Sequence, residues 1–311
     1  MRCPLLLLAA VALVVVPVQA RAAKFVLKRQ QEDVRVEIDG KLFTIYRTST
    51  GPKPILWPVI GPTGVEMARA FPMKDVPGEK HDHPHQRSVW FTHGDVNGVD
   101  FWSETPKHGS IAHREYLRLE EGDGQAVVAA VNDWVDAAGK KVCEDRRVLT
   151  FGSGKDWRSI DWEITLVASE GPVKFGDTKE GSLGIRIPTA MDTNSKLGGH
   201  IVNSAGQTDD DTWGKPASWV DYYGTVDGQA VGIAFMNHPT SFRYPTRWHV
   251  RNYGLFAANP FGLRDFVGKN DVDGSYLLEK GASLVLRHRM LFHTGDAKSA
   301  KIAEVFEQYG K

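Results

Sequence analysis

Alternating apolar and polar residues, the pattern of β-strands with one buried face, recur along most of the chain. The segments with this period of two are 34–38, 42–46, 88–92, 126–135, 146–151, 160–168, 183–187, 231–236 and 284–292. The turn-forming pairs Asp39-Gly40 and Asp227-Gly228 lie next to such segments and predict hairpins. The chain is therefore predicted to be all-β, with mainly antiparallel strand pairs.

A single helix is predicted, at the C-terminal end of the chain. Its apolar stripe, which Asp296 would cap and which ends at Gly310, consists of Ile302, Val305, Phe306 and Tyr309. The stretches 51–86, 97–112 and 189–217 show few strand patterns, and irregular segments of that length usually carry function. We expect one domain over residues 23–311, a large two-sheet sandwich similar to the galactose-mutarotase-like supersandwich, with a cleft on one concave face.

The N-terminus has the features of an export signal. Arg2 precedes an apolar run of twelve residues, 5–16, and small residues follow up to Ala22. This arrangement predicts a signal peptide over residues 1–22 and an exported protein, periplasmic or extracellular. The run is shorter than the roughly 20 apolar residues that cross a bilayer, and no later run is longer, so no integral membrane span is expected. Removal of Cys3 would leave Cys143 without a disulfide partner.

Composition narrows the class of ligand. The 38 basic residues balance the 38 acidic ones, so the chain has no net positive field to hold a nucleic acid. Nine tryptophans, eight tyrosines and 31 glycines supply flat apolar surfaces and tight turns, as carbohydrate-handling β proteins often do. A neutral or locally recognised substrate, such as a carbohydrate, therefore fits better than a polyanion, although the same composition suits any β-sandwich.

Four histidines lie between residues 81 and 93, a dense group of titratable side chains. In an extended backbone His81, His83 and His85 would share one face, about 7 Å apart. Together with His93 and Asp95 they could bind one divalent metal ion, because imidazole and carboxylate suit zinc, iron, copper or nickel. The alternative is a polar loop whose imidazoles hydrogen-bond to backbone and carboxylate groups.

A second group of arginines, histidines and aromatic residues lies between residues 237 and 254. Guanidinium groups match vicinal hydroxyls or a carboxylate, and aromatic rings match the apolar face of a sugar. The alternative is a hairpin whose amphipathic side chains cover a sheet. The substrate-binding residues predicted here and elsewhere in the chain are Arg87, Trp102, Arg186, Arg243, Arg247, Trp248, Arg251, Tyr253 and Asn259.

Acid–base chemistry is predicted for residues of three segments. Glu180 stands among glycines, and its even spacing from Arg186 would put both side chains on the same face of a strand. This placement suits a general base, although a solvated carboxylate in a turn fits equally well. Imidazoles exchange protons near neutral pH. The predicted catalytic residues are His85, His93, His238, His249 and Glu180.

Several long motifs resemble the PmoA-like family of secreted bacterial proteins. They are HPHQRSVWFTHGDVNG (83–98), GSLGIRIP (181–188), NHP (237–239), WHVR (248–251) and YGLFAANPFG (253–262). The methane oxygenase label attached to that family comes from a membrane subunit with several transmembrane helices, which this chain lacks. The resemblance implies no settled catalytic residues.

Three functions are compatible with these features. The favoured one is a secreted carbohydrate-active enzyme, a lyase, hydrolase or epimerase of glycosides or sugar acids, that uses histidine acid–base steps with or without a divalent metal. The second is a non-catalytic carbohydrate-binding protein of the cell envelope. The third is a copper or iron oxygenase, which the family label suggests and the histidines permit.

Overall fold

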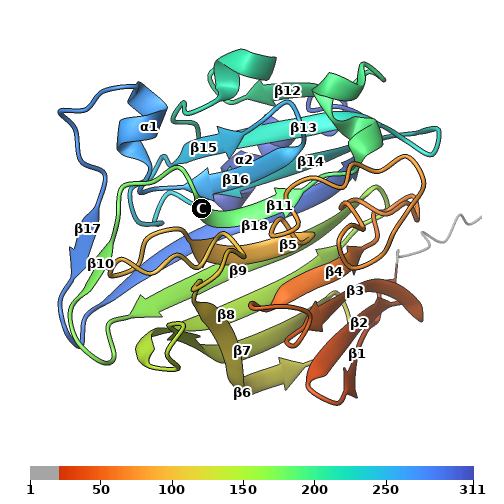
Figure 1. Ribbon diagram of the computed structural model, residues 1–311. Helices are drawn as coiled ribbons and strands as arrows, with labels where there is room; N and C mark the ends of the chain where they lie inside the picture. Colours follow the sequence, from red (N-terminus) through yellow and green to blue (C-terminus); the bar gives the residue numbers. More distant parts are fainter. Residues whose placement is uncertain (1–20) are drawn as a thin grey trace, which may run out of the picture.

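The computed structural model describes residues 21–311, which form two large antiparallel sheets that face each other (Figure 1). The first sheet has eight strands in the order β1-β2-β3-β4-β5-β11-β16-β15. Their bounds in this order are Phe25–Gln30, Asp33–Ile38, Lys41–Arg47, Ile55–Val59, Val89–His93, Gly181–Arg186, Leu255–Asn259 and Arg247–Val250.

The second sheet also has eight strands, in the order β12-β13-β14-β18-β9-β8-β7-β6. Their bounds in this order are His200–Asn203, Trp219–Val226, Gln229–Asn237, Ser283–Thr294, Trp157–Val167, Lys141–Ser153, Gln125–Val135 and Ser110–Glu120. A small ladder pairs β10 (Val173–Phe175) with β17 (Tyr276–Leu278), at the left of Figure 1. The helices are α1 (Leu263–Val267) and α2 (Ile302–Tyr309), with 3₁₀ turns at Thr189–Met191, Thr193–Ser195 and Asp209–Thr212.

Side-chain alternation divides each sheet into a core face and an outer face. On β5, Val89 and Phe91 belong to the large apolar core between the sheets, whereas Trp90 belongs to a separate cluster. That cluster lies on the outer face of the first sheet, where Trp102 from the loop after β5 packs on Trp90 at a ring distance of 5.3 Å. The outer face is therefore covered by irregular segments, and these carry the candidate site.

Helix α2 packs on the outer face of the second sheet. Its first residue, Ile302, contacts an apolar cluster formed by Ala234, Met236 and Leu291 of β14 and β18. The predicted cap is wrong, because Asp296 accepts a hydrogen bond from the backbone of Ser299 at 2.7 Å in a turn before the helix. The N-cap residue is Lys301.

The all-β prediction is confirmed, including its two large sheets and its C-terminal helix. The Asp39-Gly40 and Asp227-Gly228 turns join β2 to β3 and β13 to β14 with positive φ at all four residues, as two-residue hairpins require.

Some strands lie where no strand was predicted. The segments expected to be irregular contain β4 and β12, and β6 begins at Ser110. Pro58 lies inside β4 and cannot donate to a ladder, and β6 is an edge strand with mostly exposed residues, so neither shows apolar alternation.

The predicted signal peptide, apart from its last two residues, lies outside the described residues. Between residues 21 and 311 the structure has no helix that is both long and apolar enough to cross a membrane.

Candidate active site

Charged and aromatic side chains gather on the outer face of the first sheet, around the ends of β4, β5, β11 and β16. We call this group the histidine site. Its members are Lys53, Asp82, His83, His85, Arg87, Trp102, Glu104, Arg186 and Tyr253, with Arg69 and Gln86 behind them.

Asp82 is held by two buried arginines. Arg186 donates to both carboxylate oxygens at 2.7 and 3.1 Å, and Arg69 donates at 2.5 Å. Arg186 also donates to the side-chain oxygen of Gln86. Burial alone would raise the pKa of Asp82, but the charges and hydrogen bonds of the two arginines lower it to about 2. Asp82 is therefore ionised at neutral pH and fixed in position.

Tyr253 connects this ion cluster to the histidines. The His83 imidazole stacks on its ring at 5.0 Å and 5°, and the Arg186 guanidinium carbon lies 4.8 Å from the same ring. Arg251 approaches the ring at 5.8 Å. The phenol ring is thus held among cations, and part of it is exposed to a ligand.

A second ion cluster contains Lys53 and Glu104. The Lys53 side chain is fully buried, and its ammonium donates to Glu104 at 3.1 Å and to the Trp102 carbonyl at 3.4 Å. Arg87 binds Glu104 through two hydrogen bonds of 2.7 and 2.6 Å. Burial lowers the pKa of Lys53 to about 8, against the opposing effect of Glu104. The ammonium is therefore still mostly protonated at pH 7.

His85 lies between the two ion clusters. Its ring centroid is 5.7 Å from that of His83 and 6.4 Å from that of Trp102. Burial, and then the charge of Lys53, lower the pKa of His85 to about 4, so the imidazole is neutral at pH 7. Within residues 21–311 neither ring nitrogen has a hydrogen-bond partner, and the side chain is half-buried. A neutral, unpaired imidazole can accept a proton from a ligand.

A cavity of about 380 Å³ adjoins the site at Tyr253, which is one of its lining residues. Arg251 lies over the Trp213 ring at 5.4 Å and forms one wall with it. Asn194, Asp210, Val250 and Asn252 line the rest. Aromatic faces beside an arginine suit a sugar ring and its hydroxyls.

Three predicted catalytic histidines lie elsewhere. His93 faces the space between the sheets, where it contacts Phe261 at 5.0 Å and the Gly176 carbonyl at 2.8 Å. His249 is buried, with Nδ1 at 2.8 Å from the Lys179 carbonyl. Burial lowers the pKa of both, to about 4 for His93 and about 3 for His249. His238 lies beside α2, with its ring 5.0 Å from that of Tyr309.

Four predicted substrate-binding side chains are engaged in internal contacts. Each of them donates hydrogen bonds to backbone carbonyls of the protein itself. Arg243 donates to Pro260, Gly274 and Ser275, and Arg247 donates to Gly214. Trp248 donates to Ala217, and Asn259 donates to Thr178 and Lys179. The structure thus brings Arg87, Trp102, Arg186 and Tyr253 to the histidine site and Arg251 to the adjoining cavity, but not these four. Glu180 lies at its edge, partly exposed. Partial burial raises the pKa of Tyr253, Gln86, Arg186 and Arg251 lower it, and the charge of Glu180 makes a smaller contribution that raises it.

The predicted metal ligands do not converge. Residue His83 has a φ of 45°, so the backbone turns there and the extended geometry assumed for residues 81–85 is wrong. His81 stacks on Phe71 at 4.5 Å, and Asp95 accepts a backbone hydrogen bond from Gly98. In the described part of the chain no group of three or more His, Cys, Asp or Glu side chains could hold a metal ion.

Sequence reasoning missed Lys53, Arg69, Asp82, Gln86 and Glu104 as members of the site. Lys53 stands between two prolines before β4, and Glu104 lies in an irregular segment. Lys53 reaches the histidines because β4 and β5 are neighbours in the sheet, and Arg69 is placed by its backbone hydrogen bond to the Arg186 carbonyl at 2.8 Å. No spacing along the chain marks them.

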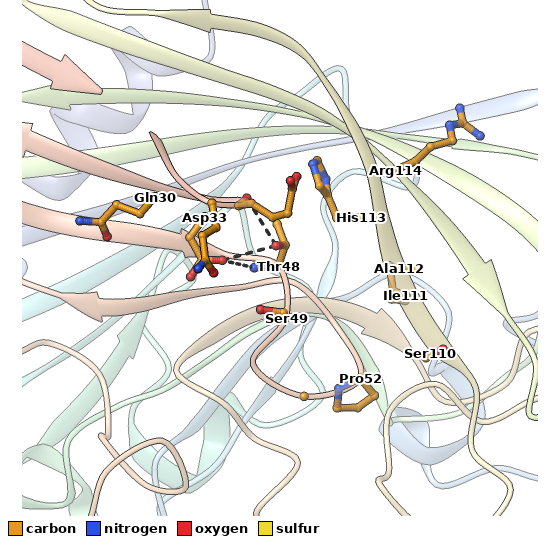
Figure 2. A pocket seen from close by; sticks show the side chains of 13 residues that line it. Gln30, Asp33, Thr48, Ser49, Pro52, Ser110, Ile111, Ala112, His113 and Arg114 are labelled. Atoms are coloured by element: carbon orange, nitrogen blue, oxygen red, sulfur yellow. Dashed lines mark hydrogen bonds between the residues drawn. The ribbon is translucent and has the colours of Figure 1, made fainter. Parts of the chain in front are cut away.

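A cavity of about 660 Å³ lies at the edge of the two sheets between β1, the end of β3 and β6 (Figure 2). Its lining is mainly polar and contains no Trp, Tyr or Phe. Asp33 and Thr48 are hydrogen-bonded to each other there. It lacks the aromatic faces of the histidine site, although His113 lines it and neither of the two buried nitrogens of that imidazole has a hydrogen-bond partner among the described residues.

Fold and site define a two-sheet β-sandwich protein with a histidine- and arginine-rich site on the outer face of one sheet. The chain belongs to a family of unknown function, DUF6807, whose model matches residues 33–307. The predicted membership of the PmoA-like family stays a prediction, because the matching family is described only as one of unknown function. No curated protein matches the chain.

Solved structures that resemble the chain include carbohydrate enzymes. The GH36 α-galactosidase AgaA from Geobacillus stearothermophilus has 12% identity and a TM-score of 0.44, over 88% of this chain and 41% of that one. A galactose mutarotase related enzyme from Lactobacillus acidophilus has 9% identity and a TM-score of 0.35, over 87% and 97%. A galactose mutarotase-like protein from Clostridium acetobutylicum has 9% identity and a TM-score of 0.36, over 88% and 99%. The chain thus spans about two fifths of the α-galactosidase.

Proposed function

We propose that the protein is a carbohydrate-active enzyme that works by proton transfer, with His85 as the general base. The observation that carries this proposal is the neutral, unpaired His85 imidazole between two ion clusters and beside aromatic rings. We also propose that the enzyme acts outside the cytoplasm, which rests on the export pattern of residues 1–22.

The site supports this chemistry in the following way. One sugar unit lies in the cavity against Tyr253 and Trp213, where Arg251 donates to its hydroxyl or carboxylate oxygens, and the reacting unit extends past Tyr253 toward His85. His85 takes a proton either from a hydroxyl, whose electron pair stays on that oxygen as an alkoxide, or from a carbon next to a carbonyl, whose electron pair moves onto the carbonyl oxygen as an enolate. The positive charge of Lys53 disfavours the protonated form of His85, so the imidazolium readily returns its proton to the product.

Proton NMR in D₂O tests the proposal directly. The purified protein is incubated with a panel of neutral sugars, uronic acids and simple glycosides, and spectra are followed for anomer exchange, deuterium incorporation or bond cleavage. Catalysed change in at least one compound, lost in His85→Ala, supports the enzyme. Binding without turnover would instead support a non-catalytic carbohydrate-binding protein.

The pH dependence of kcat/KM is expected to follow His85. Because the base must be neutral, kcat/KM should stay level near pH 6–7 and fall about tenfold per pH unit below a pKa of about 4. In Lys53→Met a nearby positive charge is lost, so the pKa of His85 rises and the acidic limb moves to higher pH. An acidic limb at the same pH in both proteins would show that another group is titrating.

Arg251 is expected to contribute to binding rather than to proton transfer. Loss of a charged hydrogen bond, worth about 1.5–3 kcal/mol, should raise KM about 10- to 100-fold in Arg251→Ala with little change in kcat. Arg118→Ala is the matched control, since Arg118 is an exposed arginine on β6 of the other sheet. Steady-state kinetics on the substrate found by NMR measure both; an equal KM in the two variants would remove Arg251 from the binding wall.

A further inference from the structure

A second cavity lies on the opposite sheet, under the C-terminal segment. It has a volume of about 360 Å³, at the lower end of the roughly 300–1,000 Å³ typical of small-molecule sites. Its floor comes from β9 and β18, and its roof from residues 299–308. We call it the Trp157 cavity; the residues that matter for its chemistry are Asp156, Trp157, Arg289, His293, Ser299 and Gln308.

Trp157 is an exposed aromatic ring held in a fixed place. Trp157 has an exposed fraction of 40%, which is high for a tryptophan in this protein, since five of the other tryptophans are fully buried. The indole lies against glycine backbone: a methyl group added at Gly152 would be 3.5 Å from the ring, and one at Gly154 would collide with it. One side of the indole therefore rests on the Gly152–Gly154 segment, and exposed ring surface is left beside the cavity.

The cations of this cavity are already neutralised. Arg289 binds Asp161 through two hydrogen bonds of 2.6 and 2.7 Å, and its guanidinium lies 4.4 Å from the Tyr309 ring. His293 is paired with Asp221 at 2.9 Å, and both side chains are buried. No free positive charge among these residues is left to attract an anion, so a phosphate or a uronate is not the expected ligand.

Two polar groups at the cavity are free to bind hydroxyls. Among residues 21–311 the Asp156 carboxylate and the Gln308 side-chain amide have no hydrogen-bond partner, and both residues are exposed. A carboxylate accepts from hydroxyl groups, and an amide both donates and accepts. An aromatic face between such groups matches a ring that is apolar on one side and carries hydroxyls at its edge.

We propose that the Trp157 cavity is a second carbohydrate-binding site, specific for neutral saccharides. The ligand stacks one sugar face on Trp157 and directs hydroxyls to Asp156 and Gln308. Because this cavity is on the outer face of the second sheet and the histidine site is on that of the first, binding here does not require turnover at His85. Its role is to hold a polymer or glycan on the protein.

Affinity gel electrophoresis tests this site with defined probes. The protein is run in native gels that contain hydroxyethylcellulose, galactomannan, dextran or polygalacturonate. We expect retardation by at least one of the three neutral polymers, and at least a tenfold weaker affinity in Trp157→Ala. Leu277→Ala is the matched control, because Leu277 is also a large exposed apolar residue, on β17.

The variants separate this site from the histidine site. Retardation that persists in His85→Ala and Arg251→Ala but is lost in Trp157→Ala supports the second site, whatever the outcome of the turnover assay. Retardation that Trp157→Ala leaves unchanged, retardation by polygalacturonate alone, or none in any gel would overturn it. Circular dichroism melting of Trp157→Ala shows whether the variant is folded, and Gln308→Ala, on the exposed face of α2, provides a second variant if it is not.

Discussion

Replacement of His85 by alanine is expected to lower kcat by about 10²- to 10⁴-fold, the contribution typical of a positioned general base. The imidazole is the unpaired neutral base of the histidine site, whereas Asp82 is bound by two arginines, Glu104 is bound by Arg87 and Lys53, and Nδ1 of His83 lies 3.1 Å from Asp82. Turnover of the substrate found by NMR measures the loss.

His238→Ala is the matched control for this experiment. His238 is also an incompletely buried histidine, but it lies beside α2 on the other side of the sandwich. Both variants should keep the melting temperature of the parent to within the small effects usual for surface substitutions. Full turnover in His85→Ala, or an equal loss in His238→Ala, would contradict the assignment of the base.

The second large effect is expected on stability, at a buried ion pair between the sheets. Asp145 accepts two hydrogen bonds from Arg147, at 2.7 and 2.9 Å, and one each from Asn132 and Trp134 at 2.8 and 2.7 Å. All four residues are buried. In Asp145→Asn the guanidinium stays in the core without its counter-charge, so we expect the free energy of unfolding to fall by about 3–5 kcal/mol.

Urea unfolding followed by circular dichroism measures this change. Arg287→Ala is the matched control, because Arg287 forms an ion pair with Glu163 at 2.9 Å on the exposed face of the second sheet. Such a surface pair contributes about 0–1 kcal/mol. If Asp145→Asn unfolded at the same urea concentration as Arg287→Ala, the buried pair would not be a major source of stability.

Much of the fold could be predicted because burial on one face leaves a period of two in the sequence. The strands with that alternation, such as β2, β3 and β9, were all found. Strand β6 was missed, because an edge strand is exposed to solvent and its polar residues conceal the period. Strand β4 was missed because Pro58 interrupts it and only Ile55 and Leu56 pair with β5.

The histidine group shows the limit of reasoning from spacing. His81, His83 and His85 are neighbours in the chain, but the left-handed backbone at His83 sends their side chains to different partners. His93 lies on the core side of β5, away from His85. Spacing predicts a shared face only where the backbone is regular, and this loop is not.

The sequence by itself therefore determined the all-β class, the hairpins, the C-terminal helix and the segment that contains the candidate base, since each depends on residues close together in the chain. Only the tertiary structure decided which side chains meet that base. Lys53, Glu104 and Tyr253 come from segments far apart in sequence. Lys53 and Glu104 reach His85, and Tyr253 stacks on its neighbour His83, because β4, β5, β11 and β16 are neighbours in one sheet. Burial and charge, which make His85 neutral, arise only from that assembly.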